Sequence, residues 1–514
     1  MKVQSAISMV LLVIAAAVTG FAQQRGSCGV VDQQPLLDRV SAHQKSLSEH
    51  VTTRSSIVKY VPVTFILVAD DNGNGRVREE QVLSLVDGLN ANYADQDMSF
   101  YIDQIKYKDH TLMFTETTNA AAIFQMKLLK DPNSMNIFIV KDANNGGGTP
   151  GTTLAYYSSV NDWIVTRKEQ VNYALGTLEH EIGHFFSLAH TFAGWECDPY
   201  DPDVHGNPVA SIWSPCNGSI RNELMDGSNC TTAADRICDT NPDYNFGFGW
   251  SVGGDGCAEY TPTVMDYNGD VIDVVENNYM GYFIGCENYE FSPTQKNIIQ
   301  SDFLSSARAY LRTGYVPTLD TVSEEVSYVY PINGEETGTS GIVDLDWEDV
   351  PEATDYLIIV DRSATFSLVP RRFWASESFL TVDGLSPNLT YYWRVWPFNE
   401  SRTGAGWSPS QSFHTGEVSA VSTIHSVSRL DIFPNPLSAG SELSVAIESD
   451  APFNADFALY DLTGEVVWSR REQQIEAGKH VVVPVSTERL PAGFYILKVQ
   501  SETGGLISRK VNIF

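Results

Sequence analysis

The segment from His180 to His190 constrains this chain more than any other, because it carries three histidines and a glutamate in a fixed pattern. Its sequence is HEIGHFFSLAH. If the first half is helical, His180 and His184 lie one turn apart on the same face, and both imidazoles can bind one metal ion. His190 can bind that ion only if the chain turns sharply after His184. Three protein ligands would leave the fourth tetrahedral position of a zinc ion open for water, which distinguishes a catalytic zinc site from a structural one.

Glu181 follows the first histidine, on the flank of the same predicted helix. From there it can accept a proton from a zinc-activated water without binding the metal. Apolar residues that recur every three or four positions predict the helix itself; they are Ala174, Leu175, Leu178, Ile182 and Phe186. The alternative is a solvated helix whose polar side chains bind nothing.

Length and charge narrow the class of protein. At 514 residues the chain is too long for one ordinary core, so about two to four domains are expected. The net charge of −31 argues against nucleic-acid binding, which needs clustered Lys and Arg.

Residues 1–22 have the charge, apolar run and small residues of a secretory signal peptide. No later segment has the roughly 20 apolar residues needed to cross a bilayer, so we expect no transmembrane segment in the mature chain.

Export permits disulfide bonds, and the positions of the cysteines suit them. Six follow the histidine segment in a loop-rich stretch: Cys197, Cys216, Cys230, Cys238, Cys257 and Cys286. Three disulfides are expected there, although six cysteines allow about 15 pairings. Cys28 is left over, and its thiolate is a candidate fourth zinc ligand that would displace the water.

The pattern of apolar residues divides the chain into parts. Strands are predicted over 60–68, 135–140 and 154–158, and helices over 36–47 and 79–90. The last of these strands, if it lies at an edge, could bind an extended peptide as an added strand. A Pro/Thr/Ser/Glu linker over 314–327 precedes two blocks of short strands, 328–416 and 428–514, each the length of a β-sandwich module.

Several motifs resemble the metzincin metalloproteases, and within them the pappalysin/cytophagalysin family. They are LEHEIGH at 178–184, HTF at 190–192, DRICDT at 235–240, NYMGY at 278–282 and FSPTQ at 291–295. The resemblance implies a metzincin catalytic domain over residues 56–315 that hydrolyses internal peptide bonds with zinc. In that family a methionine lies beneath the zinc and a tyrosine two residues later stabilises the oxyanion. Met280 and Tyr282 match these roles, with Met265 and Tyr267 as rivals.

Relatives also bind calcium near the Asp-Thr motif, which makes Asp235 and Thr240 candidate calcium ligands; the alternative is a capped loop without an ion. Metzincins usually have glycine where this chain has Ser187. We expect Ser187 to adopt a positive φ at a cost of about 1–2 kcal/mol. The departure leaves open a rival site in which Glu223, rather than His190, is the third zinc ligand.

RGSCG at 25–29 resembles propeptides of this family, in which a cysteine binds the zinc until cleavage. Residues 23–55 are therefore expected to be a propeptide with Cys28 as its cysteine switch, released by cleavage near Arg54. The alternative for Cys28 is a spare thiol.

The two C-terminal blocks resemble known modules. Residues 328–416 resemble a fibronectin type III domain, through Trp347 and a tyrosine corner at Tyr391. Residues 428–514 resemble the C-terminal sorting domain of type IX secretion, through FPNP at 433–436 and LPAGFYILKV at 490–499. This implies export by the outer-membrane type IX secretion machinery and a secreted or cell-surface location. The strand pattern alone also fits carbohydrate-binding modules.

The sequence therefore predicts an α/β (α+β) metzincin catalytic domain followed by two all-β sandwich domains. The expected function is that of a secreted zinc-dependent endopeptidase, made as a latent zymogen, that acts on protein or peptide substrates with Glu181 as general base. The alternative is a surface adhesin or binding protein with a structural or inactive metal site. Such a site would need neither Glu181 nor Tyr282.

Overall fold

A computed structural model describes residues 27–28, 33–49, 58–143, 153–252 and 256–514, apart from short gaps at 324, 339–340, 369, 417–423, 425, 439, 489 and 503–504. The expected signal peptide and the cleavage site near Arg54 lie outside the described residues. The chain forms two compact units: Met1–Asp320 with Glu400–Gly404, and Thr321–Asn399 with Ala405–Phe514.

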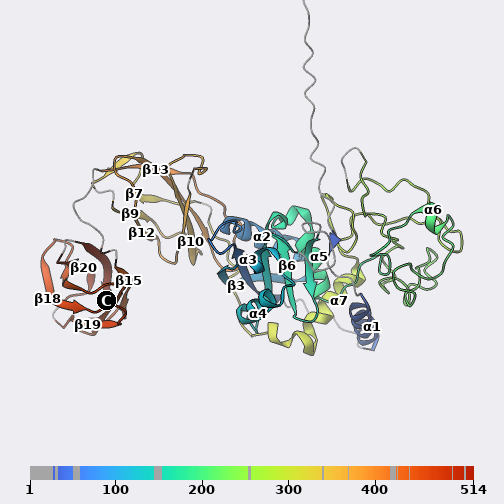
Figure 1. Ribbon diagram of the computed structural model, residues 1–514, viewed down its shortest axis with the longest axis horizontal. Coiled ribbons are helices and arrows are strands. Elements are labelled where there is room, and N and C mark those ends of the chain that lie inside the picture. The colour runs from blue at the N-terminus through green and yellow to red at the C-terminus, as the bar shows by residue number, and fades with distance from the viewer. Residues whose placement is uncertain are drawn as a thin grey trace, which may run out of the picture. The chain divides into compact units, whose positions relative to one another are not determined.

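A six-stranded sheet in the order β1-β5-β6-β4-β2-β3 forms the centre of the first unit (Figure 1). Its strands are β1 (Ser27–Cys28), β2 (Lys59–Ala69), β3 (Met98–Asp109), β4 (Met135–Val140), β5 (Thr153–Ser158) and β6 (Trp163–Arg167). β2 is parallel to β3 and β4, and β4 is parallel to β6, whereas β5 is antiparallel to β6. The three predicted strands are confirmed as β2, β4 and β5.

Successive apolar side chains of β2 explain why it lies inside the sheet. Val63 and Phe65 contribute to one hydrophobic core, while Ile66 and Val68 contribute to a second. A parallel strand covered on both faces needs apolar residues at consecutive positions rather than at alternate ones, as in the run VTFILV.

Helices cover both faces of this sheet. α1 (Gln34–Glu49), α2 (Glu79–Asn92), α5 (Thr177–Phe185) and α7 (Pro293–Leu304) share the larger core with the sheet, and α3 (Thr111–Thr115) and α4 (Ala120–Leu129) share the smaller one. Short 3-10 helices occur at η1 (Ala94–Gln96), η2 (Lys168–Gln170), η3 (Tyr173–Leu175) and η4 (Ser306–Leu311). The predicted helices over 36–47 and 79–90 are confirmed as α1 and α2.

Between α5 and α7 the described chain has one short helix, α6 (Pro202–His205), and is otherwise made of loops and isolated bridges. Three disulfides cross-link this stretch: Cys197–Cys216, Cys230–Cys238 and Cys257–Cys286. The expected number of disulfides is confirmed, and their pairing, which the sequence left open, follows the order of the cysteines along the chain.

The second unit contains two β-sandwiches. In the first, sheets β11-β10-β13-β14-β8 and β12-β9-β7 share a core that includes Trp347 and Trp393. In the second, sheets β15-β16-β19 and β18-β17-β20-β21 share another core. The strands are β7 (Tyr328–Tyr330), β8 (Glu335–Thr337), β9 (Ile342–Trp347), β10 (Asp355–Asp361), β11 (Arg371–Ala375), β12 (Phe379–Asp383), β13 (Thr390–Phe398), β14 (Gln411–Thr415), β15 (Val427–Phe433), β16 (Glu442–Ser449), β17 (Phe453–Tyr460), β18 (Val466–Ile475), β19 (Val481–Ser486), β20 (Gly493–Ser501) and β21 (Leu506–Ile513). At the predicted tyrosine corner, the Ser386 backbone N–H donates to the Tyr391 hydroxyl at 2.9 Å.

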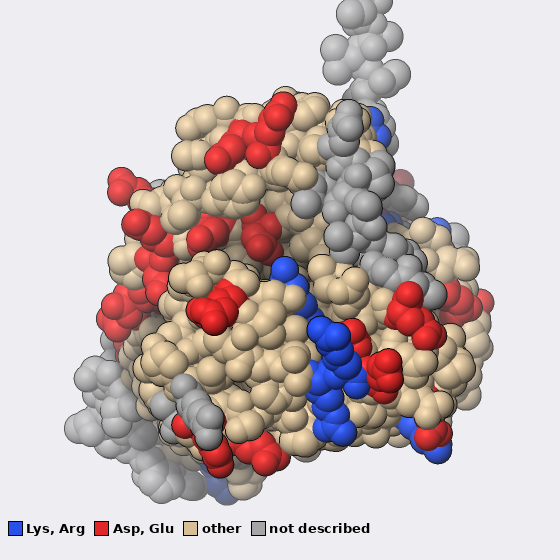
Figure 2. Space-filling model, turned by 90° about the vertical axis from the view of Figure 1, so that its left-hand side faces the viewer, with Lys and Arg blue, Asp and Glu red and all other residues tan. Residues whose placement is uncertain are grey.

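The surface reflects the acidic composition. Figure 2 shows one face on which carboxylates are scattered widely, with a central band of Lys and Arg side chains and a few more near the edges of the view. Within the described part of the chain, no helix combines the length and the apolar character needed to cross a membrane.

Candidate metal centre

The end of α5 explains how His190 reaches the same place as the two helical histidines. The helix stops after Phe185, and Ser187 has φ +76°, the left-handed conformation expected there. The Leu188 N–H donates to the Gly183 carbonyl at 2.9 Å, which folds the chain back on the helix. The Ser187 hydroxyl is buried without a hydrogen-bond partner in the described structure. The predicted strained turn is confirmed.

The three histidines converge on one point. The Nε2 atom of His184 lies 3.1 Å from that of His180 and 3.1 Å from that of His190. Nitrogen ligands of a tetrahedral zinc ion are separated by about 3.3 Å, since each Zn–N bond is roughly 2.0–2.1 Å. Within the described residues, these histidines form the one group of three or more His, Cys, Asp or Glu side chains close enough to hold a metal ion.

The hydrogen bonds of the Nδ1 atoms of His180 and His184 determine which ring nitrogen faces the point where the three histidines converge. His180 Nδ1 lies 2.6 Å from the Tyr279 carbonyl oxygen and His184 Nδ1 lies 2.8 Å from that of Leu188. A carbonyl can only accept, so both Nδ1 atoms donate and both Nε2 atoms present lone pairs to the centre. Nitrogen lone pairs at this separation repel one another unless a cation lies between them. The donor set therefore fits zinc.

Burial keeps the rings neutral. It lowers the pKa of His180 to about 4, and together with the neighbouring histidines it holds the pKa values of His184 and His190 well below the usual range. A neutral imidazole has the free lone pair that metal binding requires.

Met280 lies directly beneath α5. It is fully buried, and a Cβ atom added to Gly183 would lie 2.5 Å from its Sδ atom, so this methionine needs glycine at that helix position. The Met280 N–H donates to the Asn278 side chain, which is itself paired with Gln295 of α7. This packing places Met280, the methionine preferred from the sequence, under the helix that carries two of the histidines.

Glu181 and Tyr282 line one small cavity together with His180. Glu181 is buried, and the Tyr282 ring centre lies 5.2 Å from that of His190 and 5.9 Å from that of His180. The structure thus brings the proposed base, the proposed oxyanion donor and the three histidines into one region.

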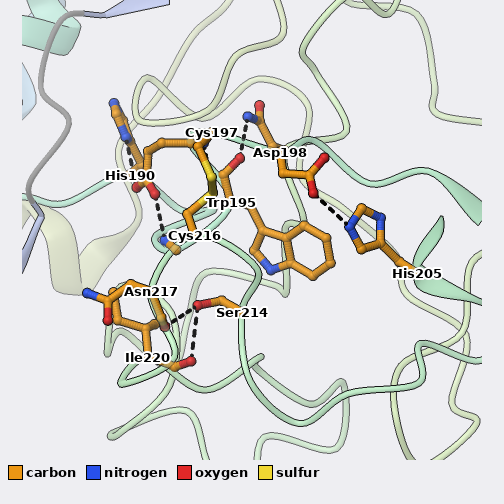
Figure 3. The surroundings of a disulfide bond; sticks show 12 residues. His190, Trp195, Cys197, Asp198, His205, Ser214, Cys216, Asn217 and Ile220 are labelled. Atoms are coloured by element: carbon orange, nitrogen blue, oxygen red, sulfur yellow. Dashed lines mark hydrogen bonds and ion pairs between the residues drawn. A yellow bond between two sulfur atoms is a disulfide. The ribbon is translucent and has the colours of Figure 1, made fainter.

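A carboxylate that the sequence analysis missed contacts the third histidine. Glu196 Oε1 lies 3.4 Å from His190 Nδ1, and Glu196 Oε2 accepts the Gly194 N–H at 2.8 Å. Burial raises the pKa of Glu196 to about 7. The next residue belongs to the Cys197–Cys216 disulfide, and Figure 3 shows this disulfide beside His190. The proximity of Glu196 to Cys197 in the sequence was the only available signal.

A second cluster of buried acids surrounds Asp235. Asp235 is fully buried and accepts from the Thr240 hydroxyl at 3.0 Å, so the two candidate calcium ligands are in contact. Burial raises the pKa of Asp235 well above the usual range of a carboxyl group, and burial together with the charge of Asp235 raises that of Glu223. Glu223 Oε2 is buried and has no hydrogen-bond partner among the described atoms. Glu223 is thus a neighbour of Asp235 and does not belong to the histidine group.

The N-terminal strand β1 lies along β5. Ser27 pairs with Thr153 and Cys28 pairs with Ala155 in parallel register. Residues 27–28 therefore lie along the strand that could bind an extended peptide if it were at an edge of the sheet. The Cys28 side chain lies outside what the structure describes.

Comparisons with known proteins agree with parts of this description. Residues 431–513 match the family described as "Secretion system C-terminal sorting domain". A protein of Colletotrichum graminicola named "Extracellular metalloprotease" is 24% identical over 309 residues, which are 56% of this chain and 92% of that protein. One of the same name from Sordaria macrospora is 24% identical over 258 residues, 47% of this chain and 74% of that protein. The chain is therefore an export substrate of the type IX system, secreted or held at the cell surface, with distant relatives named as metalloproteases.

The solved structures that match this chain resemble it only weakly. The chicken CNTN1 FN1-FN3 domains match 38% of this chain and 68% of that chain at 12% identity and a TM-score of 0.16. Fibronectin(III)-like modules of Clostridium thermocellum CbhA match 37% of this chain and 93% of that chain at 13% identity and a TM-score of 0.14. Scores this low carry no argument about the fold.

Proposed function

We propose that this chain is a secreted zinc-dependent endopeptidase of the metzincin type, which hydrolyses internal bonds of protein or peptide substrates. The convergence of three neutral imidazoles on one point, with Nε2 atoms 3.1 Å apart, carries the proposal. When bound there, zinc would lower the pKa of a water molecule and polarise the carbonyl of the substrate.

The residues around the metal centre carry out the other parts of the proposed hydrolysis. Glu181 accepts a proton from the attacking water and delivers it to the leaving amine. Tyr282 donates a hydrogen bond to the oxyanion, which develops only in the transition state. Met280 supports the histidines from below. The backbone carbonyls of Tyr279 and Leu188 hold the orientation of His180 and His184.

Latency is part of the proposal. Residues 23–55 act as a propeptide, with Cys28 as the fourth zinc ligand of the precursor. The pairing of β1 with β5 supports this, because a strand already at that edge excludes an extended substrate from it.

Calcium is proposed as a second ion, held by Asp235 and Thr240. The buried Glu223 carboxylate, whose Oε2 has no hydrogen-bond partner among the described atoms, adds a third candidate ligand. Buried acids with raised pKa values lack the positive charge that would stabilise their ionised forms. Oxygen donors of this kind are those that calcium prefers.

The two C-terminal blocks have separate roles in the proposal. Residues 328–416 act as a fibronectin type III-like module, and residues 428–514 act as the sorting domain.

The decisive experiment compares the wild-type protein with Glu181→Ala on casein, with zinc content measured on both. We expect equal zinc and at least about a hundredfold loss of activity in the variant. Glu290→Ala, at an exposed position, serves as the control and should stay active. Cleavage that persists in Glu181→Ala would refute the mechanism, and a wild-type protein that binds no zinc would favour the adhesin alternative.

A further inference from the structure

Phe192 contacts both the third histidine and Tyr282, and the proposed mechanism gives it no role. Its ring stacks on that of His190, with centroids 4.4 Å apart and planes 13° apart. On another side, its ring centre lies 4.4 Å from that of Tyr282, with planes 58° apart. Phe192 is fully buried. The place of the Tyr282 ring relative to a proposed zinc ligand therefore depends on Phe192.

The main chain fixes Phe192 opposite the segment that carries Tyr282. The Thr191 N–H donates to the Met280 carbonyl at 3.3 Å. This bond joins the residue before Phe192 to the residue two positions before Tyr282. The Thr191 hydroxyl donates to the buried Asp243 carboxylate at 2.8 Å. The two segments cannot slide past each other without breaking these bonds, and buried polar groups left without partners are costly.

The backbone of Tyr282 is held on a further side. A Cβ atom added to Gly247 would collide with the main chain at Tyr282 and Phe283, so this stretch packs directly against Gly247. The Phe283 side chain is buried in the same hydrophobic cluster as Phe192. The ring of His180 lies 5.9 Å from that of Tyr282. The main chain of Tyr282 is thus fixed, and the Phe192 ring limits where its side chain can point.

The residue type at position 192 suits this role. Phenylalanine is rigid, and it has no polar atom that could compete for the Tyr282 hydroxyl or for His190 Nδ1. A smaller aliphatic side chain would leave space beside the Tyr282 ring, because buried side chains interdigitate with few voids. An oxyanion donor has to lie about 2.7–3.1 Å from the position that the oxyanion will occupy. A misplacement of about 1 Å can lower the rate by about 100-fold.

We propose that Phe192 is a positioning residue for the hydrolysis, which holds the Tyr282 hydroxyl at the place where the oxyanion develops. This inference rests on the proposed endopeptidase function. Phe192 touches neither the substrate nor the reacting atoms in this account, so it acts through Tyr282. Its loss should lower kcat and leave KM unchanged, because the contact with the oxyanion forms only in the transition state.

The test is a double-mutant cycle that combines Phe192→Leu with Tyr282→Phe, with kcat and KM measured on one peptide substrate. Tyr282→Phe alone should lower kcat by about 100- to 1,000-fold. Phe192→Leu alone should lower kcat by about 10- to 100-fold. In the Tyr282→Phe background, Phe192→Leu should change kcat by less than about twofold, because no hydroxyl is left to position.

Phe138→Leu is the matched control for the loss of a buried ring. Phe138 is fully buried, contacts the ring of Trp163 at 5.4 Å and belongs to the smaller core of the sheet. This variant should lower the melting temperature as Phe192→Leu does, but keep the wild-type kcat. Zinc affinity, measured by competition against a chelator, should fall less than about threefold in Phe192→Leu, short of the 10- to 100-fold that follows loss of a partner of a metal ligand.

Equal losses of kcat in both Tyr282 backgrounds would overturn the inference, as would a loss confined to KM or an unchanged kcat in Tyr282→Phe. A larger loss of zinc affinity would mean that Phe192 acts through His190 instead. If Phe192→Leu does not fold, Phe192→Met replaces it as a flexible side chain that fills more of the space; failure of both to fold would make Phe192 a residue of the core alone and would also refute its role. Casein cleavage that depends on Glu181 separates the two failures: without it the proposed function falls as well, and with it only the role of Phe192 falls.

Discussion

Replacing Glu196 should weaken zinc binding, because Glu196 is the side chain that orients the third histidine. The other two histidines are oriented by backbone carbonyls, which no substitution removes. The Glu196 contact with His190 Nδ1, at 3.4 Å, is the one that mutation can delete. Loss of such a partner lowers metal affinity by about 10- to 100-fold, or roughly 1.4–2.7 kcal/mol.

The assay is competition for zinc against a chromogenic chelator at fixed pH. We expect Glu196→Gln, which keeps the shape, near the lower end of that range, and Glu196→Ala near the upper end. Asp198→Asn is the control: this nearby carboxylate is about half exposed and contacts His205 instead of a proposed zinc ligand. Its affinity should match that of the wild type.

The Cys197–Cys216 disulfide offers an independent way to perturb the same contact. The Cys216 N–H donates to the Gly194 carbonyl at 3.0 Å, and the Gly194 N–H holds Glu196 Oε2. A protein with both cysteines replaced by serine should therefore also bind zinc more weakly. If both Glu196 variants, still folded, bind zinc within twofold of the wild type, the orienting role is refuted.

Three further predictions concern stability. Ser187→Gly should stabilise the protein by about 1 kcal/mol in denaturant titrations, because it removes the cost of a non-glycine residue at positive φ; Ser187→Ala separates this effect from loss of the unpartnered hydroxyl, and a destabilised glycine variant would contradict the reasoning. Arg308→Met should destabilise by about 3–5 kcal/mol, because it removes the guanidinium from the buried Asp302 carboxylate and leaves His43 as its remaining ion-pair partner; Arg308→Lys should lose less, and equal melting temperatures for wild type and Met variant would exclude the effect. Burial raises the pKa values of Asp235 and Glu223 well above those of ordinary carboxyl groups. When a chelator keeps calcium away, the folded state therefore holds protons that the unfolded state releases above about pH 4. Stability without calcium should therefore fall as pH rises toward these values, and the rise in melting temperature on adding calcium should be larger at pH 9 than at pH 6. Glu223→Gln should reduce that rise, and a calcium effect that shrinks with pH would argue against the site.

The sequence predicted those parts of the site that depend on local spacing. His180 and His184 face one way because a helix places them one turn apart, and Ser187 lies where the chain has to reverse. Met280 was preferred over Met265 from the offsets of later motifs, and its contact with α5 agrees with that choice.

The remaining features depend on the tertiary fold. Glu196 and Glu223 are ordinary acids in the sequence, and only the folding of the loops after α5 buries one beside His190 and the other beside Asp235. The disulfide pairing could not be chosen from among so many combinations. The pairing of β1 with β5 joins residues far apart in the chain, and two residues carry no strand pattern.

The three disulfides connect the chemistry of the site to the export of the protein. Cys197–Cys216 holds the loop of Glu196, Cys230–Cys238 encloses Asp235, and Cys257–Cys286 anchors the wall of the cavity. Two of them therefore close loops that carry Asp235 or residues of the cavity wall, and the third begins at the residue after Glu196. Disulfides form in oxidising compartments and are rare in the cytosol. The C-terminal sorting domain directs the chain out of the cell, so the covalent links that complete the site can form only once the chain has left the cytoplasm.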